Sequence, residues 1–173
     1  MRLYGYFRSS AVYRVRIALN LKQLPHDTVP VHLLRDGGEQ HRPDYVARNP
    51  QGLVPALETD EGVILTQSLA IIEYLDECYP DPRLLPTYPL ERARVRQIAY
   101  AIACDIHPLN NLRMRQKLAQ MGHSEAEIMS DWYAHWIKVG FEALETMLAG
   151  SPETGRFCHG DTPTLADICL VPQ

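Results

Sequence analysis

A proline-dense segment from Tyr79 to Pro89 limits what this chain can fold into more than any other feature. Four of its residues are prolines, and neither a helix interior nor a central strand can continue through them. We therefore predict a linker over residues 80–89 that separates a domain at 1–79 from a second domain at 90–173. A length of 173 residues suits two small domains.

The part before the linker alternates short strand-like and helix-like patterns. The predicted elements, in chain order, are a strand at 2–6, a helix opened by Ser9-Ser10, a strand at 28–33, a short helix at 43–48, strands at 54–58 and 63–65, and a helix opened by Gln67-Ser68. Pro30 cannot donate to a ladder, so the second strand should lie at an edge. This order indicates a mixed sheet with helices packed on it.

The part after the linker predicts helices only. Apolar residues recur with helical spacing over 92–106, and Pro108 should kink or end that helix. A long helix is predicted over 125–148, with one apolar stripe that we interpret as core packing. The stripe consists of Ile128, Trp132, Trp136, Val139, Ala143 and Met147. Thr164 and Asp167 fit a capping box that opens a further helix.

Composition and charge argue against several classes of protein. Lys and Arg number 17 against 21 Asp and Glu, and this net charge of −4 is the opposite of what a nucleic-acid binder carries. No apolar run approaches the roughly 20 residues that span a bilayer, and the start lacks a signal-peptide pattern, so we expect a cytoplasmic protein. The seven histidines lack metal-ligand spacing, so no metal is expected. Widely spaced cysteines predict buried free thiols at Cys78, Cys104, Cys158 and Cys169.

Two predicted helix starts could bind anions. Arg8-Ser9-Ser10 precedes the first helix and Gln67-Ser68 precedes a later one. Free N–H groups at a helix start stabilise a thiolate or a carboxylate, and a serine hydroxyl can donate to a sulfur anion. The same residues equally suit plain helix caps, and the local pattern alone favours that interpretation.

Two further features carry polar chemistry. A cis bond at Val54-Pro55 would expose the Val54 N–H and C=O to an extended peptide, although an ordinary trans proline is the commoner case. Polar residues gather around the Pro108 break and predict either a wet cleft or a solvated helix face. They are Asp105, His107, Asn110, Asn111, Arg113 and Arg115. The residues by themselves indicate a two-domain protein with an anion-tolerant cleft.

Longer motifs now narrow the alternatives. Residues 8–19, RSSAVYRVRIAL, closely resemble the S-S-C-x-W-R-V-R-I-A-L signature of zeta-class glutathione transferases, the family that includes bacterial maleylacetoacetate isomerases. Further similar segments follow in order at 49–50, 54–55, 67–75, 84–86, 161, 166–167 and 169–173. Two departures are Ala11 for the family's cysteine, which removes a possible second sulfur contact, and Tyr13 for its tryptophan.

The resemblance implies an α+β protein of glutathione transferase architecture. It implies a thioredoxin-like N-terminal domain with a mixed four-stranded sheet, an all-helical C-terminal domain, a cis Val54-Pro55 bond and a homodimer. Family members continue beyond the position of Gln173, so the helical domain is expected to be truncated and to lack an arginine that holds acidic substrates. Glutathione is the implied cofactor.

The resemblance also implies an activity and a site. The activity is glutathione-dependent cis–trans isomerisation of maleylacetoacetate to fumarylacetoacetate, by reversible thiolate addition to a small maleyl dicarboxylate. The alternatives are a maleylpyruvate isomerase, a general transferase acting on small halogenated acids, and a non-enzymatic glutathione-binding module. The implied catalytic residues are Ser9 and Ser10, and Arg8 is a further catalytic candidate because its positive charge would stabilise the enolate formed on addition. The implied glutathione contacts are Ser9, Ser10 and Ala11 at the sulfur, Gln40 at the glycyl end, Val54 and Pro55 at the cysteinyl backbone, Gln67 and Ser68 at the γ-glutamyl carboxylate, and His107, Asn111 and Arg113 from the helical domain.

Overall fold

The computed structural model describes residues 1–173, which form two compact units. One unit holds Met1–Leu85 together with Pro172, and the other holds Pro86–Val171 together with Gln173. The division falls inside the proline-dense segment, whose last proline, Pro89, begins a helix, because proline suits the first helical turn. The predicted linker boundaries at residues 79 and 89 remain predictions.

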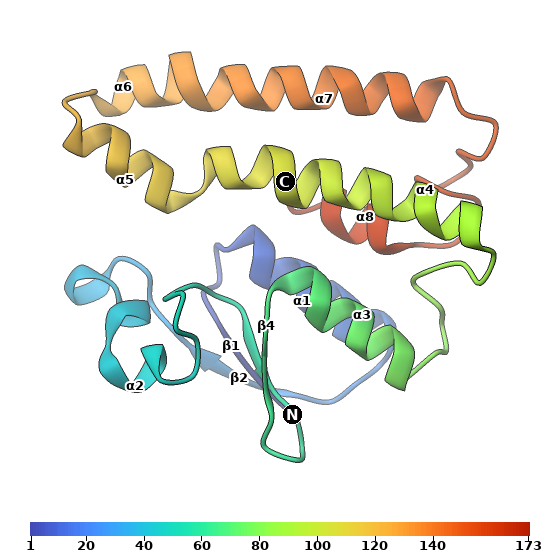
Figure 1. Ribbon diagram of the computed structural model, residues 1–173, viewed down its shortest axis with the longest axis horizontal. Coiled ribbons are helices and arrows are strands. Elements are labelled where there is room, and N and C mark those ends of the chain that lie inside the picture. Colours follow the sequence, from blue (N-terminus) through green and yellow to red (C-terminus); the bar gives the residue numbers. More distant parts are fainter. The chain divides into compact units, whose positions relative to one another are not determined.

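The first unit contains a four-stranded sheet with helices packed on it (Figure 1). Its elements are β1 (Arg2–Gly5), α1 (Ser10–Leu21), β2 (Asp27–Pro30), two 3-10 turns (Arg35–Gly37 and Glu39–His41), α2 (Pro43–Val46), β3 (Ala56–Glu58), β4 (Ile64–Thr66) and α3 (Ser68–Cys78). The strand order is β2-β1-β3-β4, with β2 parallel to β1 and the other pairs antiparallel. The predicted thioredoxin-like mixed sheet is confirmed, and β2 is an edge strand, as its proline requires.

The two faces of the sheet pack against different helices. Gly5 faces α1 so closely that a Cβ there would lie 2.5 Å from Val12 Cγ1. Strand residues alternate between faces, so Leu3 shares this side of the sheet. The side chains buried on α1 and α3 are mostly apolar and include Val12, Val15, Ala18, Leu19, Ile71, Ile72 and Leu75. On the opposite face, Tyr4 packs with Val31, Ala56 and Tyr45 of α2.

A buried ion pair fastens the segment after α3 to helices α1 and α3. The Lys22 ammonium donates to Asp76 Oδ1 at 2.8 Å and to the carbonyls of Tyr79 and Pro82 at 2.6 and 2.9 Å. The Asp76 carboxylate also accepts two backbone N–H groups, at 2.8 and 3.1 Å, from the residues just before Pro86. Both side chains are almost fully buried, so each charge depends on these partners.

The second unit is helical, as predicted. Its elements are α4 (Pro89–Tyr100), a π-helical stretch (Ala101–Ile106), a 3-10 turn (His107–Asn110), α5 (Leu112–Gln120), α6 (Glu125–Glu127), a second π-helical stretch (Ile128–Tyr133), α7 (Ala134–Ala149) and α8 (Leu165–Leu170). The predicted break near Pro108 is confirmed, because helix α4 passes through the π stretch into the 3-10 turn there. The capping box of Thr164 and Asp167 also forms. None of the helices is both long and apolar enough to span a bilayer.

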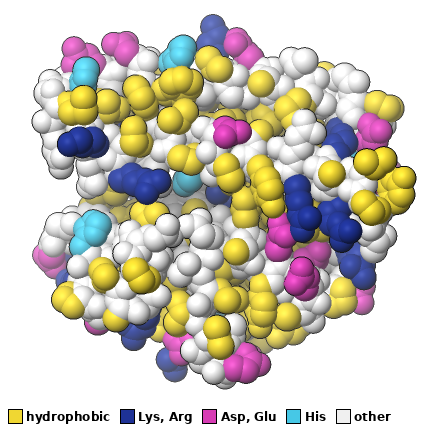
Figure 2. Space-filling view, viewed as in Figure 1, with side chains coloured by type: hydrophobic (Ala, Val, Ile, Leu, Met, Phe, Trp, Pro, Cys, Tyr) yellow, Lys and Arg dark blue, Asp and Glu magenta, His cyan; other side chains and the backbone are white.

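The predicted core stripe of the long helix is wrong. Of its members only Ile128 is buried, while Val139 is 46% exposed and Ala143 is exposed. Figure 2 shows apolar side chains at the surface along α6 and α7. The two tryptophans are half-buried: Trp132 donates its indole N–H to the Leu109 carbonyl at 2.7 Å, and its ring meets Trp136 edge to face.

A close helix approach explains which face of α7 turns inward. A Cβ added to Gly140 would lie 2.4 Å from Ile106 Cδ1, so the two helices meet at this glycine. Leu144, one turn later, is buried on the same side. Because glycine has no apolar side chain, the sequence pattern did not mark Gly140 as a core position. The predicted apolar stripe therefore lay on a face of α7 next to the one that is buried.

The expectation of four buried thiols is half wrong. All four cysteines are free, but Cys78 and Cys104 are exposed, whereas Cys158 and Cys169 are buried. Cys78 ends α3, beyond the last turn that packs on the sheet. Cys104 lies between Ile102 and Ile106, which take the buried positions of the π stretch.

Candidate functional site

The sheet register brings the predicted site segments of the first unit to one end. Tyr4 lies opposite Ala56, Ala56 lies opposite Thr66, and Gly5 lies beside Pro30. The chain therefore leaves β1, β2 and β4 and enters β3 at the same end of the sheet. The predicted residues on these connections are Arg8, Ser9, Ser10, Ala11, Gln40, Val54, Pro55, Gln67 and Ser68.

Ser9 caps α1 and still has a hydroxyl proton to give. Its Oγ accepts the N–H of Val12 at 3.3 Å, which is the cap expected of a serine. The N–H groups of Ser10 and Ala11 have no backbone acceptor, and no acidic side chain lies in the first turn. The start of α1 therefore offers two N–H groups and a hydroxyl to an anion. The neighbouring Arg8 is exposed.

The start of α3 has no side-chain cap, so the plain-cap interpretation is wrong there. Gln67 lies in the left-handed region at φ 68°, and its side chain donates to Gln51 Oε1 at 2.6 Å instead of capping the helix. The first backbone bond of the helix is made by Ile71, so three earlier N–H groups have no backbone acceptor. Buried Ser68 accepts from the Arg14 guanidinium at 3.5 Å, which adds positive charge beneath this helix start.

The Val54 backbone is presented by a fixed turn. The Val54-Pro55 bond is cis, as the family resemblance implies, and the N–H and C=O of Val54 pair with no other backbone group. The carbonyl just before them, of Leu53, accepts from the Tyr45 hydroxyl and the Asn49 amide, each at 2.7 Å. Burial raises the pKa of Tyr45 to about 12, so its hydroxyl stays protonated and donates.

Gln40 is a buried amide with an unsatisfied oxygen. Its side chain is 5% exposed, and its Nε2 lies 3.0 Å from His41 Nε2 and 3.5 Å from the Leu33 carbonyl. Its Oε1 is buried without a partner in the chain. A buried acceptor without a donor costs roughly 1–3 kcal/mol, so a ligand N–H group could satisfy it. The unpaired groups at this sheet end thus match the anionic and peptide groups of a small peptide thiol such as glutathione.

The three predicted residues of the second unit lie together around the helix break. Asn111 caps α5, and its side-chain oxygen accepts the N–H of Arg113 at 3.2 Å. His107 begins the 3-10 turn four residues earlier, and Arg113 is exposed. The Asn111 oxygen is therefore committed to the helix, while its amide NH2 can still donate. Nowhere in the chain do three His, Cys, Asp or Glu side chains gather closely enough to hold a metal ion.

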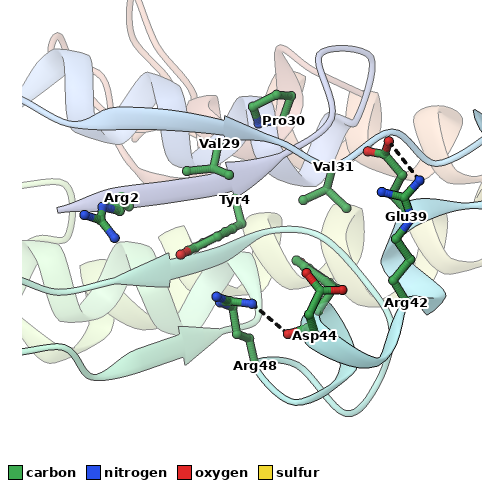
Figure 3. A pocket seen from close by; sticks show the side chains of 10 residues that line it. Arg2, Tyr4, Val29, Pro30, Val31, Glu39, Arg42, Asp44 and Arg48 are labelled. Atoms are coloured by element: carbon green, nitrogen blue, oxygen red, sulfur yellow. Dashed lines mark hydrogen bonds and ion pairs between the residues drawn. The ribbon is translucent and has the colours of Figure 1, made fainter.

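A cavity of about 340 Å³ lies elsewhere on the first unit, between α2 and the Tyr4 face of the sheet (Figure 3). Its lining residues are Arg2, Tyr4, Val29, Pro30, Val31, Glu39, Arg42, Asp44, Tyr45 and Arg48. Arg48 stacks over the Tyr4 ring at 5.3 Å and donates to the Asp44 carbonyl, and Arg42 lies 3.7 Å from Glu39. None of the predicted site residues lines it, and its arginines are engaged within the chain.

Sequence patterns indicated no site role for several residues that shape the sheet end. Arg14 is an arginine on the apolar face of α1, and that position was the one available signal of its burial. Tyr45 and Asn49 act through the Leu53 carbonyl and Gln51 through Gln67, while His41 acts through the side chain of its neighbour Gln40. No local spacing marks such contacts.

Comparison with known proteins decides the family. Residues 3–83 match the model of the glutathione S-transferase N-terminal domain. The chain is 51% identical over 173 residues to maleylacetoacetate isomerase of Pseudomonas aeruginosa, covering all of this chain and 79% of that protein. A solved maleylpyruvate isomerase, described as a bacterial zeta-class glutathione S-transferase, superposes with a TM-score of 0.94 at 48% identity, over 99% of this chain and 80% of its own. This chain is a zeta-class glutathione transferase.

A second similar structure was solved with ligands. Maleylacetoacetate isomerase of Methylobacterium extorquens, with bound malonate and glutathione, has a TM-score of 0.90 and 45% identity, over 99% of this chain and 79% of its own. These similarities confirm the predicted family, the glutathione transferase fold and glutathione as the cofactor.

Proposed function

We propose that this zeta-class transferase is a glutathione-dependent isomerase that converts maleylacetoacetate to fumarylacetoacetate. The observation that carries the proposal is the sheet end with four sets of unpaired polar groups. They are the start of α1, the uncapped start of α3, the Val54 backbone and the buried Gln40 amide. Similarity to named isomerases at about half of all positions supports the choice of reaction.

These groups divide the work of holding glutathione. The sulfur would be bound by Ser9, Ser10 and the Ala11 N–H, and the γ-glutamyl carboxylate by Gln67 and Ser68. The cysteinyl backbone would pair with Val54 beside Pro55, and the glycyl end would contact Gln40. His107, Asn111 and Arg113 would contribute from the helical unit. Bound glutathione supplies a thiolate, the nucleophile that reversible addition to a conjugated double bond requires.

The first task of the chain is to keep that sulfur ionised near neutral pH. Lowering a thiol pKa from about 8.5 to about 6.5 corresponds to about 2.7 kcal/mol. A charge-assisted hydrogen bond from Ser9 supplies about 1.5–3 kcal/mol, and a helix start supplies about 0.3–1 kcal/mol. Because the Ser9 oxygen already accepts from Val12, the hydroxyl proton is the part of the side chain left to donate.

The second task is to attract an acidic substrate and stabilise the negative charge that develops on its carbonyl oxygen. Arg8, His107 and Arg113 are the proposed groups, with Arg8 and Arg113 exposed to solvent. The chain carries a net charge of −4, so its overall field repels a dicarboxylate. Local positive charge must therefore provide the attraction.

An isomerisation assay with and without glutathione tests the proposal. We expect conversion of maleylacetoacetate only when glutathione is present, with glutathione regenerated after each turnover. Equal conversion without glutathione, or glutathione binding without any turnover, would contradict it.

A second candidate function is maleylpyruvate isomerisation. The similarity to a solved maleylpyruvate isomerase, at 48% identity, favours it specifically. Parallel measurements of kcat/KM for the two maleyl acids decide between them, and the acid with the higher value is the preferred substrate. Model electrophiles and halogenated acids in the same assay test general transferase activity.

The setting of the enzyme is part of the proposal. We propose a cytoplasmic homodimer in tyrosine and phenylalanine catabolism, the route that the proposed substrate implies. Fractionation of the source cells tests the location, and loss of growth on tyrosine after deletion tests the route.

A further inference from the structure

We propose that His41 is a positioning residue that orients the Gln40 side chain for the glycyl end of glutathione. The proposal rests on the proposed function, because it assumes that Gln40 contacts the tripeptide. His41 itself is exposed at the end of the 3-10 turn Glu39–His41, while Gln40 beside it is buried. In the proposed arrangement the buried amide contacts the tripeptide and the exposed imidazole holds that amide in place.

The first observation is the set of contacts made by the Gln40 amide. Its Nε2 lies 3.0 Å from His41 Nε2, whereas its other contact, to the Leu33 carbonyl, is 3.5 Å long. The Leu33 carbonyl can only accept, so it requires the NH2 on this side, and His41 Nε2 accepts from the same NH2 when the ring proton is on Nδ1. The amide oxygen is consequently held on the other side, where the chain offers no donor. His41 provides the shorter of the two contacts that fix this choice.

The second observation is where the imidazole itself is held. A Cβ added to Gly52 would lie 3.2 Å from His41 Nδ1 and 3.3 Å from the Gln40 carbonyl oxygen. The ring therefore packs on a turn glycine, which has φ +60° and so resists replacement by larger residues. The same turn leads directly into Leu53, whose carbonyl is held by Tyr45 and Asn49.

These contacts join two proposed glutathione-binding groups. His41 links the Gln40 amide to the turn that presents the Val54 backbone. Without the imidazole, Gln40 would keep only its long contact to Leu33, and its amide could rotate. Loss of His41 should therefore weaken recognition of the glycyl residue selectively, because the hydrogen bond of this ring is to Gln40 and not to the groups at the starts of α1 and α3.

Calorimetric titration with two thiols tests this assignment. Glutathione and γ-glutamylcysteine differ only in the glycyl residue. His41→Phe keeps a ring against Gly52 but removes the acceptor nitrogen, and we expect roughly fivefold weaker binding of glutathione, the size of one net hydrogen bond. Binding of γ-glutamylcysteine should change less than twofold. His41→Gln places an amide oxygen near the lost nitrogen and should restore most of the glutathione affinity.

Kinetics and a double-variant cycle provide readouts that a loss of stability alone would not produce. In His41→Phe the KM for glutathione should rise with little change in kcat. In a Gln40→Ala background, the same change at His41 should have no further effect on binding, because the group that it positions is gone. His123→Phe is the matched control, since His123 is exposed in the other unit.

Other results would overturn the assignment. Equal weakening of both thiols by His41→Phe, or an additive loss in the Gln40→Ala background, rules out action through Gln40. If the wild-type protein turns over with glutathione and His41→Phe keeps the wild-type KM, the role of His41 fails while the proposed function stands. If the wild-type protein does not bind glutathione, both proposals fail. His41→Ala, which removes the ring entirely, is the second variant should His41→Phe fold poorly.

Discussion

The Ser9 hydroxyl accepts from Val12 and has one proton left to donate. Ser9→Ala removes both interactions. We expect turnover to fall roughly 10- to 100-fold, from the loss of a charge-assisted hydrogen bond, with a smaller change in glutathione affinity. Steady-state kinetics and ultraviolet titration of the bound thiol check this. Ser9→Thr, which keeps a hydroxyl, is the control, and unchanged turnover in Ser9→Ala would refute the role.

Arg8 precedes Ser9 in the sequence and is exposed, and its proposed role is to attract an acidic substrate. Arg8→Ala should raise the KM for a maleyl dicarboxylate severalfold and leave a neutral electrophile nearly unaffected. The difference should shrink at high salt, because exposed charges are screened. Equal losses on both substrates would argue against carboxylate binding.

The four thiols should divide into two reactivity classes. Burial, reinforced by the hydrogen bond and charge of Asp167, raises the pKa of Cys158 to about 12, so it carries almost no thiolate at neutral pH. Cys169 is also buried, whereas Cys78 and Cys104 are exposed. A disulfide reagent should modify two thiols in the folded protein and all four after denaturation. Rapid reaction of Cys158 in the folded state would contradict its burial.

At the scale of elements, the Lys22–Asp76 pair joins the end of α1 and helix α3 to the segment that follows α3. Asp76→Ala would leave a buried ammonium without its counter-charge and remove the acceptor for two backbone N–H groups. We expect a loss of about 3–5 kcal/mol in the free energy of unfolding, measured in urea. Lys22→Met combined with Asp76→Leu should cost less, since neither charge is then buried alone.

Local chemistry predicted most elements of the fold. Pro30 marked the edge strand, Asp60-Glu61-Gly62 marked the hairpin, and Thr164 with Asp167 marked the capping box. The buried face of α7 could not be predicted this way, because Gly140 sets it through a contact with Ile106. A glycine at a helix crossing interrupts the apolar periodicity from which a buried helix face is predicted.

In the site, too, local features were predictable and contacts between distant residues were not. Serines at two helix starts are local signals, and both starts do carry unpaired N–H groups. The side-chain contacts around these helix starts could not be predicted locally. Gln67 donates to Gln51 and Arg14 donates to Ser68, and both hydrogen bonds join residues far apart in the sequence. The serine patterns located two of the helix starts at the sheet end, the family resemblance supplied Gln40 and Val54, and neither identified the neighbours that fix the orientation of these side chains.

At the scale of the whole molecule, the proposed homodimer has a simple physical signature. One chain has a mass of 19.7 kDa, and light scattering coupled to gel filtration should give twice this value. The mass should not change on tenfold dilution in the micromolar range, as expected for a dimer that persists at working concentrations. The mass of a single chain at every concentration would contradict the homodimer.

Both tryptophans of the chain, Trp132 and Trp136, sit side by side on one long helix of the second unit. Intrinsic fluorescence excited at the indole band therefore monitors only that half of the molecule. Circular dichroism in the far ultraviolet averages over both halves. Denaturation curves recorded with the two probes will superimpose if the halves melt as one, and will separate if they melt in sequence. The natural placement of two indoles thus provides a built-in spectroscopic reporter, without any label.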